Sequence, residues 1–107
     1  MKNGYEFEDD SDILLEEEED LQLKKPTMYR VIFHNDDYTT MEFVVFILES
    51  VFHKSKAEST KIMLEVHQKG TGVVGIYTHE VATTNIYLVE KLAEDQEYPF
   101  RATMEPV

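Results

Sequence analysis

Negative charge is so unevenly distributed along this chain that it limits which part can fold. Residues 1–27 contain ten Asp or Glu against three Lys, a net charge of −7, and residues 16–20 are all acidic. Residues 28–107 contain twelve acidic and seven basic residues, a net charge of −5. A segment with few branched apolar residues and this much like charge cannot bury enough surface to offset its ordering entropy. We therefore expect residues 1–26 to form a flexible, disordered acidic tail and residues 27–107 to form one small core domain.

The overall composition excludes several functional classes. A net charge of −12 argues against nucleic acid as a partner, because affinity for a phosphate backbone comes mainly from Lys and Arg. The chain has no Cys, so disulfides and thiol catalysis are excluded, and a reducing compartment is favoured. No apolar run approaches the roughly 20 residues that span a bilayer, and the acidic start does not resemble a secretory signal. We expect a cytoplasmic protein with no membrane partner.

The start of the core domain predicts a strand followed by a helix. Residues 29–34 form a short, mostly apolar run that is typical of a strand. Thr39 and Glu42 are spaced as in a capping box, in which the hydroxyl accepts a backbone N–H while the carboxylate reaches back. Residues 41–52 are apolar on nearly every side, so we expect this helix to be mostly buried.

Further caps predict the remaining elements. Ser55 and Glu58 form a second capping box, and Gly70 is a good C-terminal cap for the helix between them. Residues 72–77 have the composition of a strand, and Thr78 can cap a third helix. The apolar face of that third helix contains Val81, Ala82, Ile86, Val89 and Ala93. Residues 100–105 alternate apolar and polar side chains, as in a half-buried strand.

This order of elements, β-α-α-β-α-β, predicts an α+β fold. A small three-stranded sheet, antiparallel or mixed, would be covered on one face by three helices.

Two groups of polar side chains could form a site. Asn35, Asp36 and Asp37 precede the first helix, whereas Met63, Val66 and His67 share one face of the second because they are spaced at i, i+3 and i+4. Both groups have an ordinary structural explanation. A loop of Asn and Asp turns the chain and caps a helix, and a helical His is often a core residue with satisfied nitrogens. The residues alone leave both interpretations open.

An enzyme is the less favoured alternative. The two Asp and His67 could act as acid and base or bind a metal, but no metal-binding, phosphate-binding or nucleophile motif completes the set. The four histidines do not have metal-ligand spacing; they are His34, His53, His67 and His79. We expect neither enzymatic activity nor a cofactor or metal.

Several segments, in this order and spacing, make a specific pattern. They are residues 28–33, Asn35-Asp36-Asp37-Tyr38-Thr39 with the Met41-Glu42-Phe43-Val44 that follows, residues 63–67, residues 75–82 and residues 98–100. Together they resemble the ClpS family, the bacterial adaptors that deliver N-end-rule substrates to a Clp protease. The resemblance covers nearly all of residues 26–107.

The resemblance implies a function and the residues that perform it. The protein would be a monomeric adaptor for N-degron proteins beginning with Leu, Phe, Tyr or Trp, and it would dock on the N-terminal domain of a ClpA-type unfoldase. The residues implied to hold the free amine are Asn35, Asp36, Asp37 and His67. Those implied to form the side-chain pocket are His34, Thr39, Met41, Val44, Met63, Val66 and Phe100. Those implied to face the unfoldase are Glu80 and Asn85.

The chain also departs from the family pattern. Thr40 replaces a usual proline, His34 an aliphatic residue and Phe100 a leucine, so we expect a more polar pocket rim and a shorter floor. Asn85 replaces a common lysine, which removes one expected charge from the docking surface. The main alternative function is a general protein-interaction domain resembling the C-terminal domain of the ribosomal stalk protein, which has a similar order of elements.

Overall fold

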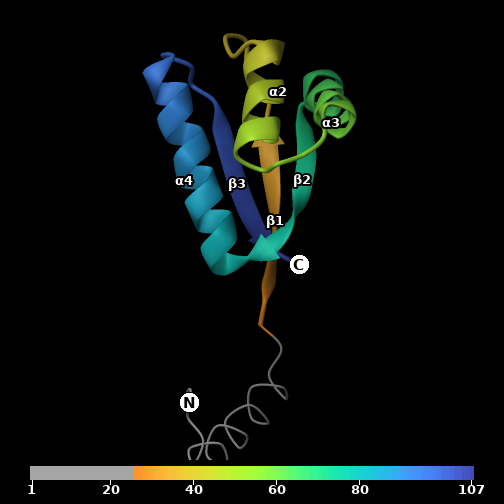
Figure 1. The fold of residues 1–107 in the computed structure, drawn as a ribbon, viewed down its shortest axis with the longest axis vertical. Coiled ribbons are helices and arrows are strands. Elements are labelled where there is room, and N and C mark those ends of the chain that lie inside the picture. The colour runs from red at the N-terminus through yellow and green to blue at the C-terminus, as the bar shows by residue number, and fades with distance from the viewer. Residues whose placement is uncertain (1–25) are drawn as a thin grey trace, which may run out of the picture.

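The computed structural model describes residues 26–107 and has the predicted α+β fold (Figure 1). Its elements are β1 (Met28–His34), α2 (Met41–Ser50), α3 (Lys56–Lys69), β2 (Thr71–Thr78), α4 (His79–Asp95) and β3 (Arg101–Pro106). The expected flexible tail, residues 1–26, lies outside the described residues except for Pro26. Within residues 26–107 no helix has both the length and the apolar character that crossing a membrane requires.

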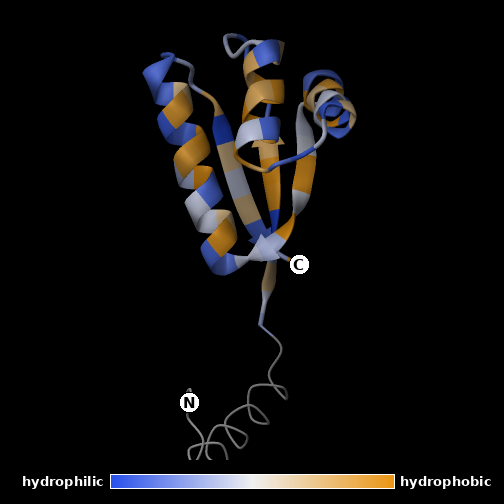
Figure 2. Ribbon diagram, in the orientation of Figure 1, coloured by the Kyte–Doolittle hydropathy of each residue, from blue (hydrophilic) through white to orange (hydrophobic). Residues whose placement is uncertain are grey.

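The three strands form one sheet with β1 in the centre, in the order β2-β1-β3. Both pairings are antiparallel, which decides between the antiparallel and mixed sheets that the sequence left open. The register between β1 and β2 shifts after Val31, as in a β-bulge. Val31 and Phe33 are fully buried, because they face the three helices that cover one side of the sheet. In Figure 2 the helices show hydrophobic stretches alternating with hydrophilic ones, as expected for elements with one buried face.

Helix α2 begins one residue later than its predicted cap implied. Thr40 is the N-cap, and its hydroxyl accepts a hydrogen bond from the Phe43 N–H at 3.1 Å. The prediction that Thr39 caps this helix was wrong, because the Thr39 hydroxyl instead donates to the Asp36 carboxylate at 2.8 Å. The helix is also less buried than expected, since Phe46 keeps 50% of its surface exposed. Its buried residues are Phe43, Val44, Ile47 and Leu48.

The caps of the other helices are confirmed. The Ser55 hydroxyl accepts from the Glu58 N–H at 3.1 Å, and Gly70 ends α3 in the left-handed region with φ of 91°. Thr78 caps α4, accepting from the Val81 N–H at 3.3 Å. The predicted apolar face of α4 was wrong at one position: Val81 is 46% exposed. A hydrophobic side chain at the solvent-facing start of this helix therefore needs a different explanation from core packing.

Gly72 lets α3 approach the sheet closely. It pairs with Phe33 across the ladder, and a Cβ at this position would lie 2.7 Å from Cγ2 of Val66. We expect Gly72→Ala to lower the free energy of unfolding by about 1 to 3 kcal/mol, the usual cost of overpacking. Urea denaturation measures this effect, with Thr71→Ala, at an exposed neighbouring position, as the control. An unchanged unfolding midpoint in Gly72→Ala would contradict the expected clash.

Candidate functional site

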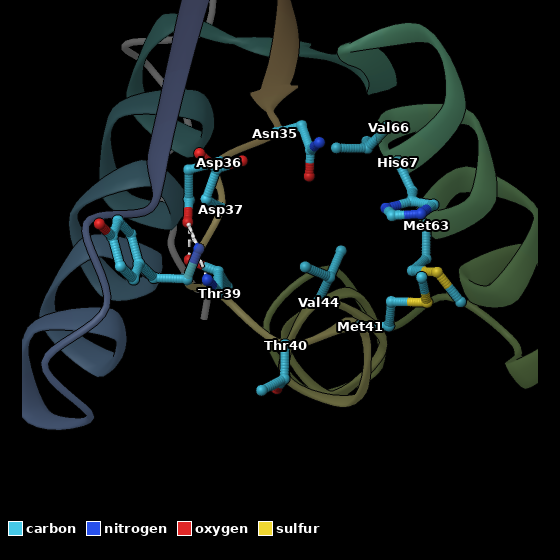
Figure 3. Close-up of a pocket in the computed structure, with 11 residues that line it drawn as sticks. Asn35, Asp36, Asp37, Thr39, Thr40, Met41, Val44, Met63, Val66 and His67 are labelled. Atoms are coloured by element: carbon cyan, nitrogen blue, oxygen red, sulfur yellow. Dashed lines mark hydrogen bonds between the residues drawn. The ribbon is translucent and has the colours of Figure 1, made fainter.

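A cavity of about 420 Å³ opens between the loop after β1, the start of α2 and one face of α3 (Figure 3). It is lined by Asn35, Asp36, Asp37, Tyr38, Thr39, Thr40, Met41, Val44, Met63, Val66 and His67. Polar groups come from the loop and from His67, whereas apolar groups come from the facing sides of the two helices. The cavity therefore combines hydrogen-bonding groups with a hydrophobic wall.

Hydrogen bonds to Asp36 fix the shape of the loop. One carboxylate oxygen, Oδ1, accepts from the backbone N–H groups of Tyr38 at 2.8 Å and Thr39 at 2.7 Å. The other, Oδ2, accepts from the Thr39 hydroxyl at 2.8 Å. Partial burial raises the pKa of Asp36, but these three hydrogen bonds outweigh it and hold the pKa below its ordinary value. The Asp36 carboxylate thus orders the loop that precedes α2.

A backbone hydrogen bond joins this loop to the end of α3. The Asn35 N–H donates to the Gly70 carbonyl at 2.9 Å, just beyond the last β1–β2 pair. The Gly70 N–H in turn donates to the Val66 carbonyl at 2.9 Å, which closes α3 beside His67. In Figure 3 the side chains of Asn35 and His67 both point into the cavity. Both residues are exposed, so their polar atoms are accessible to a ligand.

The apolar part of the cavity comes from two Met and two Val side chains. Val44 and Val66 are almost completely buried and belong to the hydrophobic core. Met41 is 42% exposed and Met63 is half-buried, and their thioethers lie close together at one side of the cavity in Figure 3. Met adapts its shape easily to an irregular apolar ligand. This wall can therefore accept a large hydrophobic side chain.

The structure brings together nine of the eleven side chains proposed for the amine and pocket sites. They are Asn35, Asp36, Asp37, Thr39, Met41, Val44, Met63, Val66 and His67.

His34 and Phe100 do not line this cavity. His34 follows the buried Phe33 in β1, so it points to the opposite face of the sheet, where its Nε2 is hydrogen-bonded to Thr103 Oγ1 at 2.7 Å. Phe100 is only 4% exposed and packs edge-on against the Phe33 ring, with centroids 4.9 Å apart. The structure therefore gives no support to the expectations that His34 makes the pocket rim more polar and that Phe100 makes its floor shorter.

Two residues that line the cavity were not predicted. Tyr38 is highly exposed at the edge of the loop, and Thr40 is the N-cap of α2. The sequence carried a signal for Thr40, because it lies three residues before Phe43 and immediately before the apolar helix. Tyr38 belongs to the motif that carries the family resemblance, but the resemblance gave it no role in the site.

The two residues proposed for docking lie on α4 and do not line the cavity. Glu80 is exposed in its first turn, and Asn85 is half-buried near the middle of the helix. Val81, Asn85 and Leu88 follow one another at i, i+4 and i+7, and both hydrophobic members are largely exposed. These residues form a continuous, partly apolar strip on the outer side of α4.

Among residues 26–107, no three or more His, Asp or Glu side chains are grouped closely enough to hold a metal ion.

We expect the hydrogen bonds of Asp36 to make the stability of the domain depend on acid. Because the folded-state pKa lies below its ordinary value, the unfolded state binds the proton more tightly. The stabilisation is present above the unfolded pKa and is lost as pH falls below about 4. Urea unfolding of wild type and Asp36→Asn at several pH values measures this, with Asp37→Asn as the control. The wild type should lose more stability in acid than Asp36→Asn, and parallel curves would contradict the expectation.

Comparison with known proteins identifies the family of this chain. Residues 24–103 match the family described as ATP-dependent Clp protease adaptor protein ClpS. The chain is 56% identical over 93 residues to the ClpS adapter of Acetivibrio thermocellus, covering 87% of this chain and 94% of the relative. It is 48% identical over 103 residues to that of Myxococcus xanthus, covering 96% of each.

A solved structure has the same fold. Agrobacterium tumefaciens ClpS2 bound to L-phenylalaninamide superposes with a TM-score of 0.75 at 32% sequence identity, covering 78% of this chain and all of the other. The family match spans the cavity, both helices that line it and the strip on α4. The chain therefore belongs to the ClpS family of adaptor proteins for the ATP-dependent Clp protease.

Proposed function

We propose that this protein captures polypeptides by a free N-terminal amine and a bulky apolar first side chain, namely Leu, Phe, Tyr or Trp. It then delivers them to a ClpA-type AAA+ unfoldase without catalysing a reaction itself. The observation that carries this proposal is one cavity that joins exposed hydrogen-bond acceptors to a hydrophobic wall. The ligand of the similar ClpS2 structure, L-phenylalaninamide, supports it, because that molecule combines an amine with an aromatic side chain.

The polar side of the cavity suits an ammonium group. An ammonium has three N–H donors and a positive charge, so it needs several acceptors, and bonds to charged groups are the stronger class. Asn35 offers its amide oxygen, His67 a ring nitrogen, and Asp37 an exposed carboxylate. Asp36 contributes negative charge, but its oxygens already accept three hydrogen bonds. We therefore assign direct contact with the amine to the first three residues and loop positioning to Asp36.

The apolar side of the cavity suits the first side chain of the ligand. Met41, Val44, Met63 and Val66 line it without a buried charge. A hydrophobic pocket with a few convergent polar groups is the usual form of a binding site for a small apolar group. A ligand side chain that reaches past Met41 would cover Val44 and Val66.

The strip on α4 supports a separate docking surface for the unfoldase. Its exposed Val81 and Leu88 offer apolar contact area, and Glu80 offers a charge at one end. We expect Glu80→Ala to weaken binding to the isolated N-terminal domain of the unfoldase by about 1 kcal/mol or less, since it removes one exposed charge. Asp95→Ala, on the same helix, is the control. Calorimetric titration measures both, and equal affinities for wild type and Glu80→Ala would count against this placement.

Delivery also depends on residues outside the cavity and α4. We assign the acidic segment 1–26 to the transfer of captured substrate rather than to capture. The adaptor would act as a monomer in the cytoplasm.

A peptide titration tests the capture step directly. Three peptides that differ only at the first residue are compared: Phe-first, Met-first and N-acetylated Phe-first. The proposal expects the Phe-first peptide to bind most tightly, because only it presents both the amine and a bulky aromatic side chain. Equal affinities for all three would overturn the proposal and favour a general protein-interaction domain.

A further inference from the structure

A second hollow of about 340 Å³ adjoins the cavity in the groove between α2 and α3. Met41 and Met63 line both hollows and form the ridge between them. The rest of this groove is lined by Glu42, Val45, Phe46, Glu49, Lys56 and Thr60. A polypeptide held by its first residue in the cavity can therefore continue over the two Met side chains into the groove.

The groove has an exposed aromatic ring between two carboxylates. Glu42, Phe46 and Glu49 are spaced at i, i+4 and i+7, so they share one side of α2. Phe46 is half-exposed although its helix is part of the hydrophobic core. Among residues 26–107, no ion pair uses Glu42, Glu49 or Lys56. Two carboxylates against one ammonium leave the groove with a net negative charge.

We propose that this groove binds a Lys or Arg side chain from residues 2–4 of the captured polypeptide. This inference rests on the proposed capture of the first residue and adds a preference for the sequence that follows it. The groove adjoins the cavity at Met41 and Met63, and an extended chain advances roughly 3.3 to 3.6 Å per residue, so the residues that directly follow the first one are those that can reach the groove.

The chemistry of the groove favours a long basic side chain over the alternatives. Its aliphatic stem can cover Met41 and Phe46, while its charged end lies near Glu42 and Glu49. An exposed aromatic face also attracts a cation. Lys56 on the opposite wall reduces this attraction but does not cancel two carboxylates. An acidic ligand residue would instead be repelled by Glu42 and Glu49.

The experiment compares peptides that all begin with Phe and carry Arg, Ala or Glu at position 2, 3 or 4. Affinities are measured for wild type and for the double variant Glu42→Gln/Glu49→Gln. At one position at least, we expect wild type to prefer Arg over Glu by about fivefold or more at low salt. The double variant should bring that ratio close to one. Phe46→Ala should weaken the Arg peptide more than the Ala peptide.

A matched control separates the local effect from net charge. Glu94→Gln/Asp95→Asn removes an equal number of negative charges from the end of α4. In this variant the ratio of the affinities for the Arg and Glu peptides should stay near that of wild type. An equal ratio in wild type and in Glu42→Gln/Glu49→Gln overturns the groove proposal. The acetylated Phe-first peptide distinguishes failure of the proposed capture function from failure of the groove proposal. If acetylation has no effect on the affinity of wild type, the capture function fails and the groove proposal with it. If acetylation weakens binding but the ratio is unchanged, the groove proposal alone fails.

Discussion

Replacing Asn35 or His67 with Ala should weaken binding of a Phe-first peptide by about 1 to 3 kcal/mol, or roughly 5- to 150-fold. Each change removes one hydrogen-bond acceptor for the ammonium of the ligand. The remaining acceptors must then stabilise a charged group that has lost its hydration on binding. Both side chains are exposed, so the fold should tolerate the substitutions. Fluorescence anisotropy with a labelled peptide measures the loss, and circular dichroism checks that each variant is folded.

Acetylation of the peptide makes the test specific for the amine. In wild type, acetylation should reduce affinity strongly because it removes the positive charge and two donors. In Asn35→Ala and His67→Ala the acetylated and free peptides should differ less, since part of the receptor for the amine is already missing. Gln68→Ala, at the exposed position next to His67, is the matched control. Undiminished affinity in both variants would remove these residues from the site.

Replacing Met41 with Ala should change which first residues the cavity accepts. The Met41 side chain lines both the cavity and the adjoining groove, so its thioether can contact Cβ of a bound first residue. Ile and Val carry an extra methyl group on Cβ, and overpacking one methyl typically costs about 1 to 3 kcal/mol. We therefore expect Met41→Ala to raise the ratio of Ile-first to Leu-first affinity by about 5-fold or more. Phe-first and Leu-first peptides should bind slightly more weakly through lost packing.

The ratio is the informative quantity, because a general loss of stability affects both peptides equally. Leu64→Ala serves as the control, since Leu64 is similarly exposed on α3 but does not line the cavity. If the Ile-to-Leu ratio in Met41→Ala equals that of wild type, another side chain selects against branching, and Met63 is the next candidate.

Features set by local interactions were predictable from the sequence. Ser55, Gly70 and Thr78 each cap a helix through contacts within four residues, so their spacing was sufficient evidence. Thr39 and Thr40 were harder to separate because both hydroxyls stand near the same helix start. The outcome depends on Asp36, whose carboxylate binds the Thr39 hydroxyl and leaves Thr40 to cap the helix. The sequence did not show which hydroxyl the carboxylate would take.

Features set by contacts between distant elements were only partly predictable. The alternation of side chains along a strand places His34 on the face of the sheet opposite to that of Phe33, whereas the resemblance suggested a place at the pocket rim. Val81 directly precedes the fully buried Ala82, so it lies about 100° further round the helix, on the exposed side that also carries Leu88. The groove beside Phe46 arises from the packing of α2 against α3, so no pattern in either helix alone predicts it.

The hydrogen bonds that tie Asn35 to Gly70 and Asp36 to Thr39 have a kinetic consequence. A loop held in place before the ligand arrives needs little rearrangement on binding, so association should proceed at a similar rate for every accepted first residue. Differences in affinity between ligands should then appear mainly as differences in dissociation rate. How long a polypeptide stays bound, rather than how quickly it is found, would decide which captured chains remain long enough to be passed on.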